Sequence, residues 1–166
     1  MAEYSHIHHT FEPVYDENSK ILILGSLPSV KSREEGFYYG HPRNRFWKVI
    51  AAVADKQTEP PVTISDKKQL LLSKGIAIWD VIESCDIKGS SDSSIKNVKA
   101  NDIERVLKNS NIKRIYANGK TAGNLYRKYI FPKLKIDIID LPSTSPANAA
   151  YSLEKLIAEW KNIFVE

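Results

Sequence analysis

The residues best suited to chemistry lie in two segments that are far apart in the chain. Residues 25–47, GSLPSVKSREEGFYYGHPRNRFW, combine three glycines, two prolines, three consecutive aromatic residues and several basic side chains. Residues 141–152, LPSTSPANAAYS, place three small hydroxyl residues between two prolines. Basic groups interleaved with aromatic rings suit a nucleic acid, because the cations pair with phosphates while the rings stack on bases. Hydroxyls and backbone N–H groups in a proline-rich turn can bind a phosphate without bulk.

The first segment holds most of the net charge of the chain. Residues 31–48 carry five basic and two acidic side chains, a net charge of +3 in a protein of +4 overall. We expect seven residues of the two segments to contact a nucleic acid: Ser29, Lys31, Arg33, Arg43, Ser143, Thr144 and Ser145. Taken singly, such residues could equally belong to the core, to a solvated face or to an ordinary turn. The functional interpretation therefore rests on their clustering.

Other kinds of site find little support in the sequence. The single cysteine, Cys85, cannot form an internal disulfide, a cysteine zinc site or an iron–sulfur cluster. His6, His8 and His9 have no carboxylate or cysteine at a useful ligand spacing, which favours structural or solvated roles. No G-x-S-x-G motif occurs, so the nucleophile elbow of a serine hydrolase is missing. We expect neither a metal ion nor an organic cofactor.

Four short apolar runs predict the strands that position these segments: residues 21–24, 76–79, 112–117 and 136–141. Near-continuous apolar strands suit a parallel sheet that is covered on both faces. The stretches between them predict helices, with an apolar stripe from Phe46 to Val53 and with caps at Ser65 and Asn101. The order predicts an α/β fold, a three-layer α/β/α sandwich with a central four-stranded parallel sheet. With 166 residues, 42% apolar and 27% charged, the chain fits one domain, residues 1–166.

Ligands of such folds bind beyond the carboxyl ends of the strands, so we expect function in residues 25–44, 80–94, 118–123 and 141–150. The polar residues 88–99 predict a surface loop, and residues 118–121, NGKT, predict a simple strand-to-helix turn. No apolar stretch is long enough for a membrane helix, and the first residues do not resemble a secretory signal. We expect an intracellular, cytoplasmic monomer that is associated with the nucleoid if it is prokaryotic.

The motifs GSLPS, YYGHPRNRFW and LPSTSPAN together resemble the uracil-DNA glycosylase superfamily. That superfamily has a Gly-x-x-Pro loop after its first strand and a (His/Asn/Leu)-Pro-Ser loop after its last. The resemblance spans residues 20–160 and is greatest to the hypoxanthine-DNA (deoxyinosine) glycosylases. It implies a monofunctional glycosylase of base excision repair that acts on double-stranded DNA carrying a deaminated base, with hypoxanthine preferred. Such enzymes flip the damaged base into a pocket.

The resemblance also implies the residues of the base pocket: Gly25, Ser26, Leu27, Pro28, Tyr39 and Asp80. Tyr39 matches the aromatic residue that stacks on the flipped base in the mismatch-specific branch. Asp80 matches a position that contacts the base in some branches. Residues 143–145 match the loop that meets the DNA backbone.

Two departures from the superfamily affect the mechanism. Several branches place a catalytic Asp or Asn where this chain has Leu27, and the implied substitute in the deoxyinosine branch is Asn44. Asn44 can hold a water or a leaving base by hydrogen bonds, which suffices if the glycosidic bond breaks first. It could also be a helix cap. The last loop, moreover, lacks the leucine and arginine that form the wedge of the mismatch-specific branch.

Two alternatives stay open at this point. One is a glycosylase of the same fold that prefers uracil or a mismatch. The other is a non-catalytic module that binds nucleotides or DNA and releases no base.

Overall fold

The central sheet is parallel and has four strands. The computed structural model describes residues 3–9, 11–56, 59–89 and 91–164. Its strands β2 (Ile21–Gly25), β3 (Ile76–Asp80), β6 (Arg114–Asn118) and β7 (Ile138–Leu141) pair in the order β3-β2-β6-β7. This confirms the predicted sheet, although its last two strands begin two residues later than the apolar runs do.

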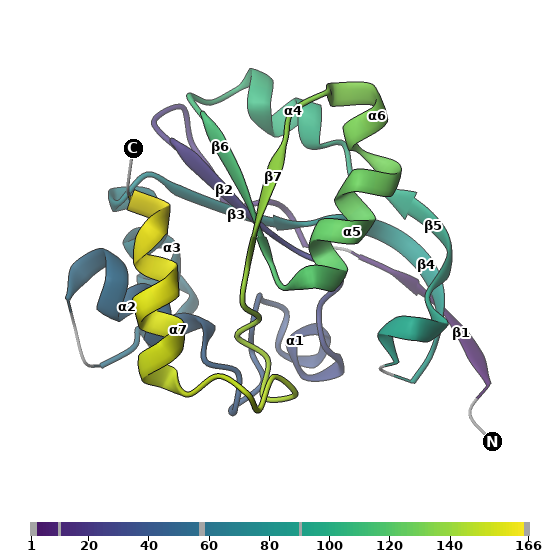
Figure 1. The fold of residues 1–166 in the computed structure, drawn as a ribbon, viewed down its shortest axis with the longest axis horizontal. Helices are drawn as coiled ribbons and strands as arrows, with labels where there is room; N and C mark the ends of the chain where they lie inside the picture. Colours follow the sequence, from purple (N-terminus) through teal and green to yellow (C-terminus); the bar gives the residue numbers. More distant parts are fainter. Residues whose placement is uncertain (1–2, 10, 57–58, 90, 165–166) are drawn as a thin grey trace.

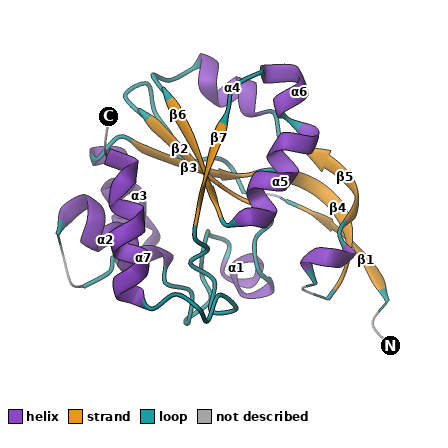
Figure 2. Cartoon of the chain, in the orientation of Figure 1, coloured by secondary structure: helices purple, strands orange, loops and turns teal. Residues whose placement is uncertain are grey.

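Helices cover both faces of this sheet (Figure 1). One side carries α2 (Phe46–Asp55), α3 (Ile64–Ser73) and α7 (Leu153–Trp160), and η2 (Lys161–Phe164) continues from α7. The other side carries α4 (Ile103–Lys108), α5 (Lys120–Tyr129) and α6 (Phe131–Leu134). Figure 2 shows the same arrangement as strands between helices, with the short α1 (Val30–Glu35) beyond the strand ends. The expected three-layer α/β/α architecture is therefore confirmed.

The core explains why the strands read as continuous apolar runs. All five residues of β2 and all five of β3 are buried, because helices exclude water from both faces of the sheet. The predicted stripe on α2 is buried at Phe46, Val49 and Ile50, and Trp160 of α7 packs edge-on against Phe46.

A second, antiparallel sheet was not predicted. Strands β1 (Tyr4–His8), β4 (Ile82–Lys88) and β5 (Lys96–Ala100) pair in the order β1-β4-β5 (Figure 1). The expectation of a surface loop at residues 88–99 was wrong for β5, and η1 (Asp92–Ser94) lies within the connection. This sheet alternates inward and outward side chains, and only Ile82, Cys85 and Ile87 are buried at the centre of its small core. So few apolar positions give little periodic signal.

Two helix caps also differ from the prediction. Thr63 caps α3, since its hydroxyl accepts the N–H of Asp66 at 3.0 Å, whereas Ser65 lies inside the helix. Asp102 caps α4 in place of Asn101. The Asn101 side chain instead donates to two backbone carbonyls, at the end of β3 and the start of β4.

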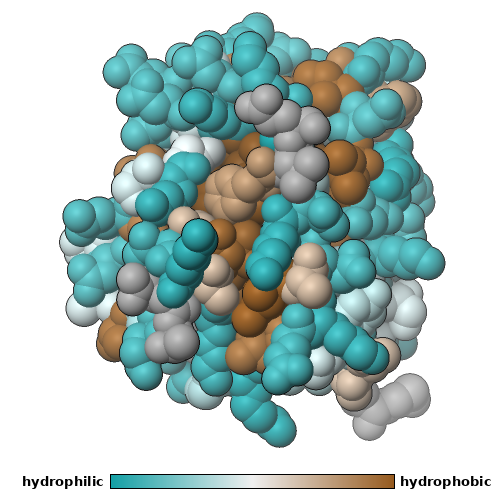
Figure 3. All heavy atoms as spheres, turned by 60° about the vertical axis from the view of Figure 1, so that its left-hand side comes forward, coloured by the Kyte–Doolittle hydropathy of each residue, from teal (hydrophilic) through white to brown (hydrophobic). Residues whose placement is uncertain are grey.

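The outer surface is largely hydrophilic. Figure 3, in which the side that carries α2, α3 and α7 comes forward, shows apolar atoms in a central strip between hydrophilic side chains. Within the described residues, no helix combines the length and the apolar character that a bilayer crossing requires.

Candidate active site at the carboxyl ends of the parallel strands

A cavity of about 940 Å³ lies at the carboxyl ends of the four parallel strands. Its volume is near the upper end of the range typical of small-molecule sites, about 300–1,000 Å³. The lining includes twelve of the fourteen site residues predicted from the sequence: Gly25, Ser26, Leu27, Pro28, Ser29, Arg33, Tyr39, Asn44, Asp80, Ser143, Thr144 and Ser145. Lys31 and Arg43 are exposed and do not line it. The structure thus brings the two sequence motifs together.

The floor of the cavity has no room for a side chain at Gly25. This glycine ends β2 and pairs with Asp80, the last residue of β3. A Cβ atom at position 25 would lie 2.4 Å from Oδ1 of Asp80 and 3.0 Å from the hydroxyl of Tyr39. The missing side chain therefore lets a carboxylate oxygen and a phenol approach the same point of the floor.

Tyr39 offers a neutral hydrogen-bond donor. Its ring stacks on Phe46, with 3.9 Å between ring centroids and planes 17° apart. Its hydroxyl is buried and has no hydrogen-bond partner within the described part of the chain. Burial raises the pKa of this hydroxyl well above its usual range, the charge of Asp80 adds to the rise, and Asn118 acts in the opposite direction. The phenol thus stays protonated, and its backbone φ of +54° shows that the turn is held under constraint.

The orientation of the Asn44 amide follows from its neighbours. The backbone N–H of Phe46, the first residue of α2, donates to Oδ1 of Asn44 at 2.9 Å. Because a backbone N–H only donates, the atom facing it is the amide oxygen. The hydroxyl of Thr144 donates to the same oxygen at 2.8 Å. Asn44 therefore supports the start of α2 from one position before the helix cap. The N-cap is Arg45, which makes no side-chain cap hydrogen bond, so the interpretation of Asn44 as the cap itself was wrong.

A second amide fixes the hydroxyl of Thr144. The backbone N–H of Thr144 donates to Oδ1 of Asn118, so Nδ2 of Asn118 faces the Thr144 hydroxyl and donates to it, both at 3.0 Å. The hydroxyl proton can then point only away from Asn118, toward Asn44. Two backbone N–H donors, of Phe46 and Thr144, therefore fix the direction of every hydrogen bond that links Asn118, Thr144 and Asn44. Oδ1 of Asn44 is occupied, and its Nδ2 group is left for the cavity.

This chain gives Thr144 an internal position. Thr144 is fully buried, so its hydroxyl is engaged inside the protein rather than presented to a phosphate. Its neighbours Ser143 and Ser145 are half-buried, and each hydroxyl oxygen accepts a backbone N–H at 3.1 Å. Accepting a proton leaves each of these two hydroxyls its own O–H to donate outward.

The sequence interpretation missed Arg45, which ties the last loop to α2. Its guanidinium donates to the carbonyl oxygens of Tyr151, Ser145 (2.9 Å) and Asn148 (3.1 Å), and its backbone N–H donates to that of Thr144. The two motifs are therefore one rigid unit. The basic residues of the GHPRNRFW motif favoured nucleic-acid binding. The neighbouring sequence does not distinguish Arg45, which has a structural role, from the exposed Arg43.

The cavity is also lined by residues that the sequence analysis did not name individually, among them polar side chains from the segments 80–94 and 118–123, in which function was expected. Asn118 and Lys120 belong to the NGKT turn, and Asp92 comes from the connection between β4 and β5. Among the residues that the structure describes, no group of three or more His, Cys, Asp or Glu side chains could hold a metal ion.

Comparison with known proteins places this site in a family. A sequence model of the uracil DNA glycosylase superfamily matches residues 12–164. A hypoxanthine DNA glycosylase of Methanosarcina barkeri is 33% identical over 156 residues, 93% of this chain and 96% of the relative. The hypoxanthine DNA glycosylase of Methanosarcina acetivorans is 34% identical over 158 residues, with the same shares covered.

A solved structure agrees with the sequence relatives. The solution NMR structure of a Methanosarcina acetivorans protein, described as a candidate uracil DNA glycosylase, superposes with a TM-score of 0.76. It is 31% identical in sequence, and the match covers 93% of this chain and 97% of that one. The motifs, the fold and the relatives of the present chain agree. This chain is a DNA glycosylase that belongs to the uracil DNA glycosylase superfamily.

Proposed function

We propose that this glycosylase releases hypoxanthine from double-stranded DNA by hydrolysis of the N-glycosidic bond, in base excision repair. The observation that carries the proposal is the Asn44 amide, held at the strand-end cavity with only its N–H groups free. Two relatives that match over nearly the whole chain and are named hypoxanthine DNA glycosylase support the choice of base.

The role of Asn44 follows from the direction of its hydrogen bonds. An amide whose oxygen is occupied cannot accept a proton from water, but its Nδ2 group can donate to a leaving base as negative charge develops there. The bond to the sugar then breaks first, and water adds to an oxocarbenium-like sugar that needs little nucleophilic push. This mechanism suits a chain with Leu27 at the position where several branches have a catalytic Asp or Asn.

The base pocket is proposed to use the cavity floor. Oδ1 of Asp80 offers an acceptor beside Gly25. Hypoxanthine carries a ring N–H next to a carbonyl, and this N–H can donate to that oxygen. The Tyr39 ring, packed against Phe46 on one face, is proposed to stack on the flipped base with its other face.

The DNA backbone is proposed to run past the two motif loops. Ser29, Arg33, Ser143 and Ser145 line the cavity and would meet phosphates near the flipped nucleotide. Lys31 and Arg43 lie outside it and would contact phosphates farther along. Lys31 also lies 3.9–4.0 Å from two glutamates of its own helix, which reduces its pull on a phosphate.

The test is a base-release assay on matched duplexes. Each duplex carries hypoxanthine, uracil or xanthine opposite each of the four bases, and alkali converts abasic sites into strand breaks. We expect the fastest release from hypoxanthine duplexes, with breaks only after alkali, as a monofunctional enzyme gives. Asn44→Ala serves as the inactive control.

Two outcomes would contradict the proposal. Faster release of uracil than of hypoxanthine would assign the enzyme to the uracil-preferring alternative. Specific binding without release from any lesion would make the chain a DNA-binding module.

A further inference from the structure

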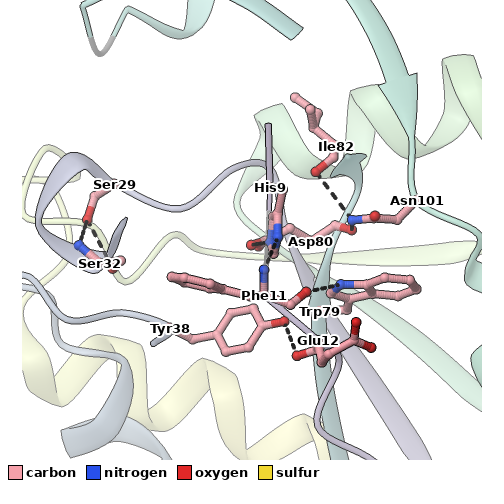
Figure 4. Close-up of polar contacts among 10 residues, drawn as sticks. All are labelled: His9, Phe11, Glu12, Ser29, Ser32, Tyr38, Trp79, Asp80, Ile82 and Asn101. Carbon is pink, nitrogen blue, oxygen red and sulfur yellow. Dashed lines mark hydrogen bonds and ion pairs between the residues drawn. The ribbon is translucent and has the colours of Figure 1, made fainter. Parts of the chain in front are cut away.

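A buried histidine outside the sequence motifs contacts the cavity floor. His9 follows β1, and its Nε2 lies 2.7 Å from Oδ2 of Asp80 (Figure 4). The two side chains are 0% and 4% exposed, so water does not compete for this contact. A second histidine–carboxylate pair, His6 with Asp86, spans the same two regions of the chain at 2.8 Å but is 64% and 26% exposed.

The proton of this contact can be placed. The backbone N–H of Phe11 donates to Nδ1 of His9 at 3.0 Å, so Nδ1 carries a lone pair and no proton. The ring proton is therefore on Nε2, where it is donated to Oδ2 of Asp80. The pair consists of a neutral imidazole and a carboxylate, and Oδ2 of that carboxylate is occupied.

The segment that carries His9 is itself held in place. The indole N–H of Trp79 donates to the carbonyl of Phe11 at 3.2 Å, and the hydroxyl of Tyr38 donates to that of Glu12 at 2.7 Å (Figure 4). The Phe11 ring packs edge-on against His9, with 5.2 Å between centroids. These contacts engage the backbone that follows His9 and one edge of its ring.

The other oxygen of the carboxylate is left for a ligand. Oδ1 of Asp80 lies over Gly25 in the cavity, and no hydrogen bond reaches it from the described residues. Asn101 holds the same stretch from behind, by donating to the Asp80 backbone carbonyl at 2.8 Å. One side chain thus has one oxygen committed to His9 and one presented to the site.

Deamination changes what such an oxygen meets. A deaminated base carries a ring N–H where its parent base carries a lone pair, so a carboxylate oxygen attracts the first and repels the second. A protonated carboxyl would instead donate to that lone pair and lose the distinction. We propose that His9 is a positioning residue that keeps Asp80 an acceptor facing the flipped base, and so sets the preference for hypoxanthine over adenine. The inference rests on the proposed function.

The test compares two substitutions at position 9 with a matched control. His9→Phe keeps a flat ring but removes the donor, His9→Gln restores an N–H of similar reach, and His6→Phe makes the same change at the exposed pair. NMR titration with free hypoxanthine and free adenine measures the preference of each folded protein. We expect the preference for hypoxanthine over adenine to fall roughly tenfold or more in His9→Phe, because the Asp80 carboxylate that accepts the ring N–H of the base is no longer held in place. His9→Gln should regain it, and His6→Phe should match the wild type.

The outcomes separate the inference from the proposed function. A wild-type preference in folded His9→Phe, or a defect in His9→Gln as large as in His9→Phe, would reduce His9 to a packing residue. If His9→Phe does not fold, Asp80→Asn decides: His9 must donate to the amide oxygen, so the amide N–H groups face the cavity and the preference should move toward adenine. An unmoved preference there overturns the inference. Base release is measured on the same samples, so inactivity with a His9-dependent preference would refute only the proposed function.

Discussion

Replacing Asn44 by Asp would separate the two roles that an amide can have in glycosidic hydrolysis. Asp keeps an oxygen where Phe46 and Thr144 donate, so both hydrogen bonds of 2.9 and 2.8 Å survive. Only the group that faces the cavity changes, from a hydrogen-bond donor to a charged acceptor. If Asn44 donates to the leaving base, the variant folds normally and loses activity.

The expected magnitudes differ for stability and for rate. Asp and Asn are about equally good at helix starts, and a negative charge at the N-terminus of α2 adds about 0.3–1 kcal/mol of stability. Losing one donor to the developing charge costs about 10²–10³ in rate, as for other positioned donors. The carboxylate also repels the departing anion. We therefore expect an unchanged or slightly raised melting temperature and at least about a hundredfold slower base release.

Single-turnover assays with saturating enzyme on a hypoxanthine duplex measure the chemical step apart from DNA affinity. Asn124→Asp, an exposed position on α5, makes the same charge change away from the cavity and should leave the rate unchanged. If Asn44→Asp releases base as fast as the wild type or faster, the residue accepts a proton from water, and the donor mechanism is wrong.

Three further changes test other parts of the site. Gly25→Ala should keep the fold but slow base release at least about tenfold. Its Cβ would lie 2.4 Å from Oδ1 of Asp80 and would displace that oxygen, and overpacking of this kind costs about 1–3 kcal/mol. An unchanged rate would remove Asp80 from the base pocket. Above pH 10, stability should fall, since folding raises the pKa of three of the eight tyrosines, Tyr38, Tyr39 and Tyr126, the last to about 12. Absorbance at 295 nm should show Tyr38 and Tyr39 ionising only as the protein unfolds, and Tyr126 ionising in the folded protein only near pH 12. A raised folded pKa favours the folded state below pH 10, and this effect is lost as the pH rises above that value. In anisotropy titrations across salt concentrations, Arg33→Ala should flatten the log–log slope of DNA binding by about one. An unchanged slope would show that Arg33 meets no phosphate.

The sequence predicts the central sheet well because its signal is local. In β2 and β3 every residue is buried, so the strands appear as unbroken apolar runs. The loops at their carboxyl ends carried the motifs, and the cavity gathers most of the residues that those motifs named. Their individual roles stay predictions. The hydrogen bond of Asn44 to the start of α2 is compatible with a role in the cavity, since its oxygen is occupied there and its nitrogen is left for the cavity.

What the sequence does not predict depends on distant partners. In β1 the one partly buried side chain is Ile7, and its pairing partner Cys85 lies 78 positions further along the chain. The contact between His9 and Asp80 joins residues 71 positions apart, so no local pattern indicates it. Thr144 lies in a polar loop and would be expected at the surface, but Asn118 and Asn44 hydrogen-bond its hydroxyl in the interior. Burial of a polar group is decided by its hydrogen-bond partners, which local patterns do not reveal.

The pairing of β1 with β4 also has a consequence for biosynthesis. The first strand joins its sheet only once residues 84–88 have been made, and the loop that fixes Asn44 comes later still, at residues 143–151. A nascent chain on the ribosome therefore lacks the hydrogen bond that orients the proposed donor Asn44 until Thr144 has emerged. We expect no base release from a nascent chain before residues 143–151 have emerged, and contacts of such high sequence separation slow its folding.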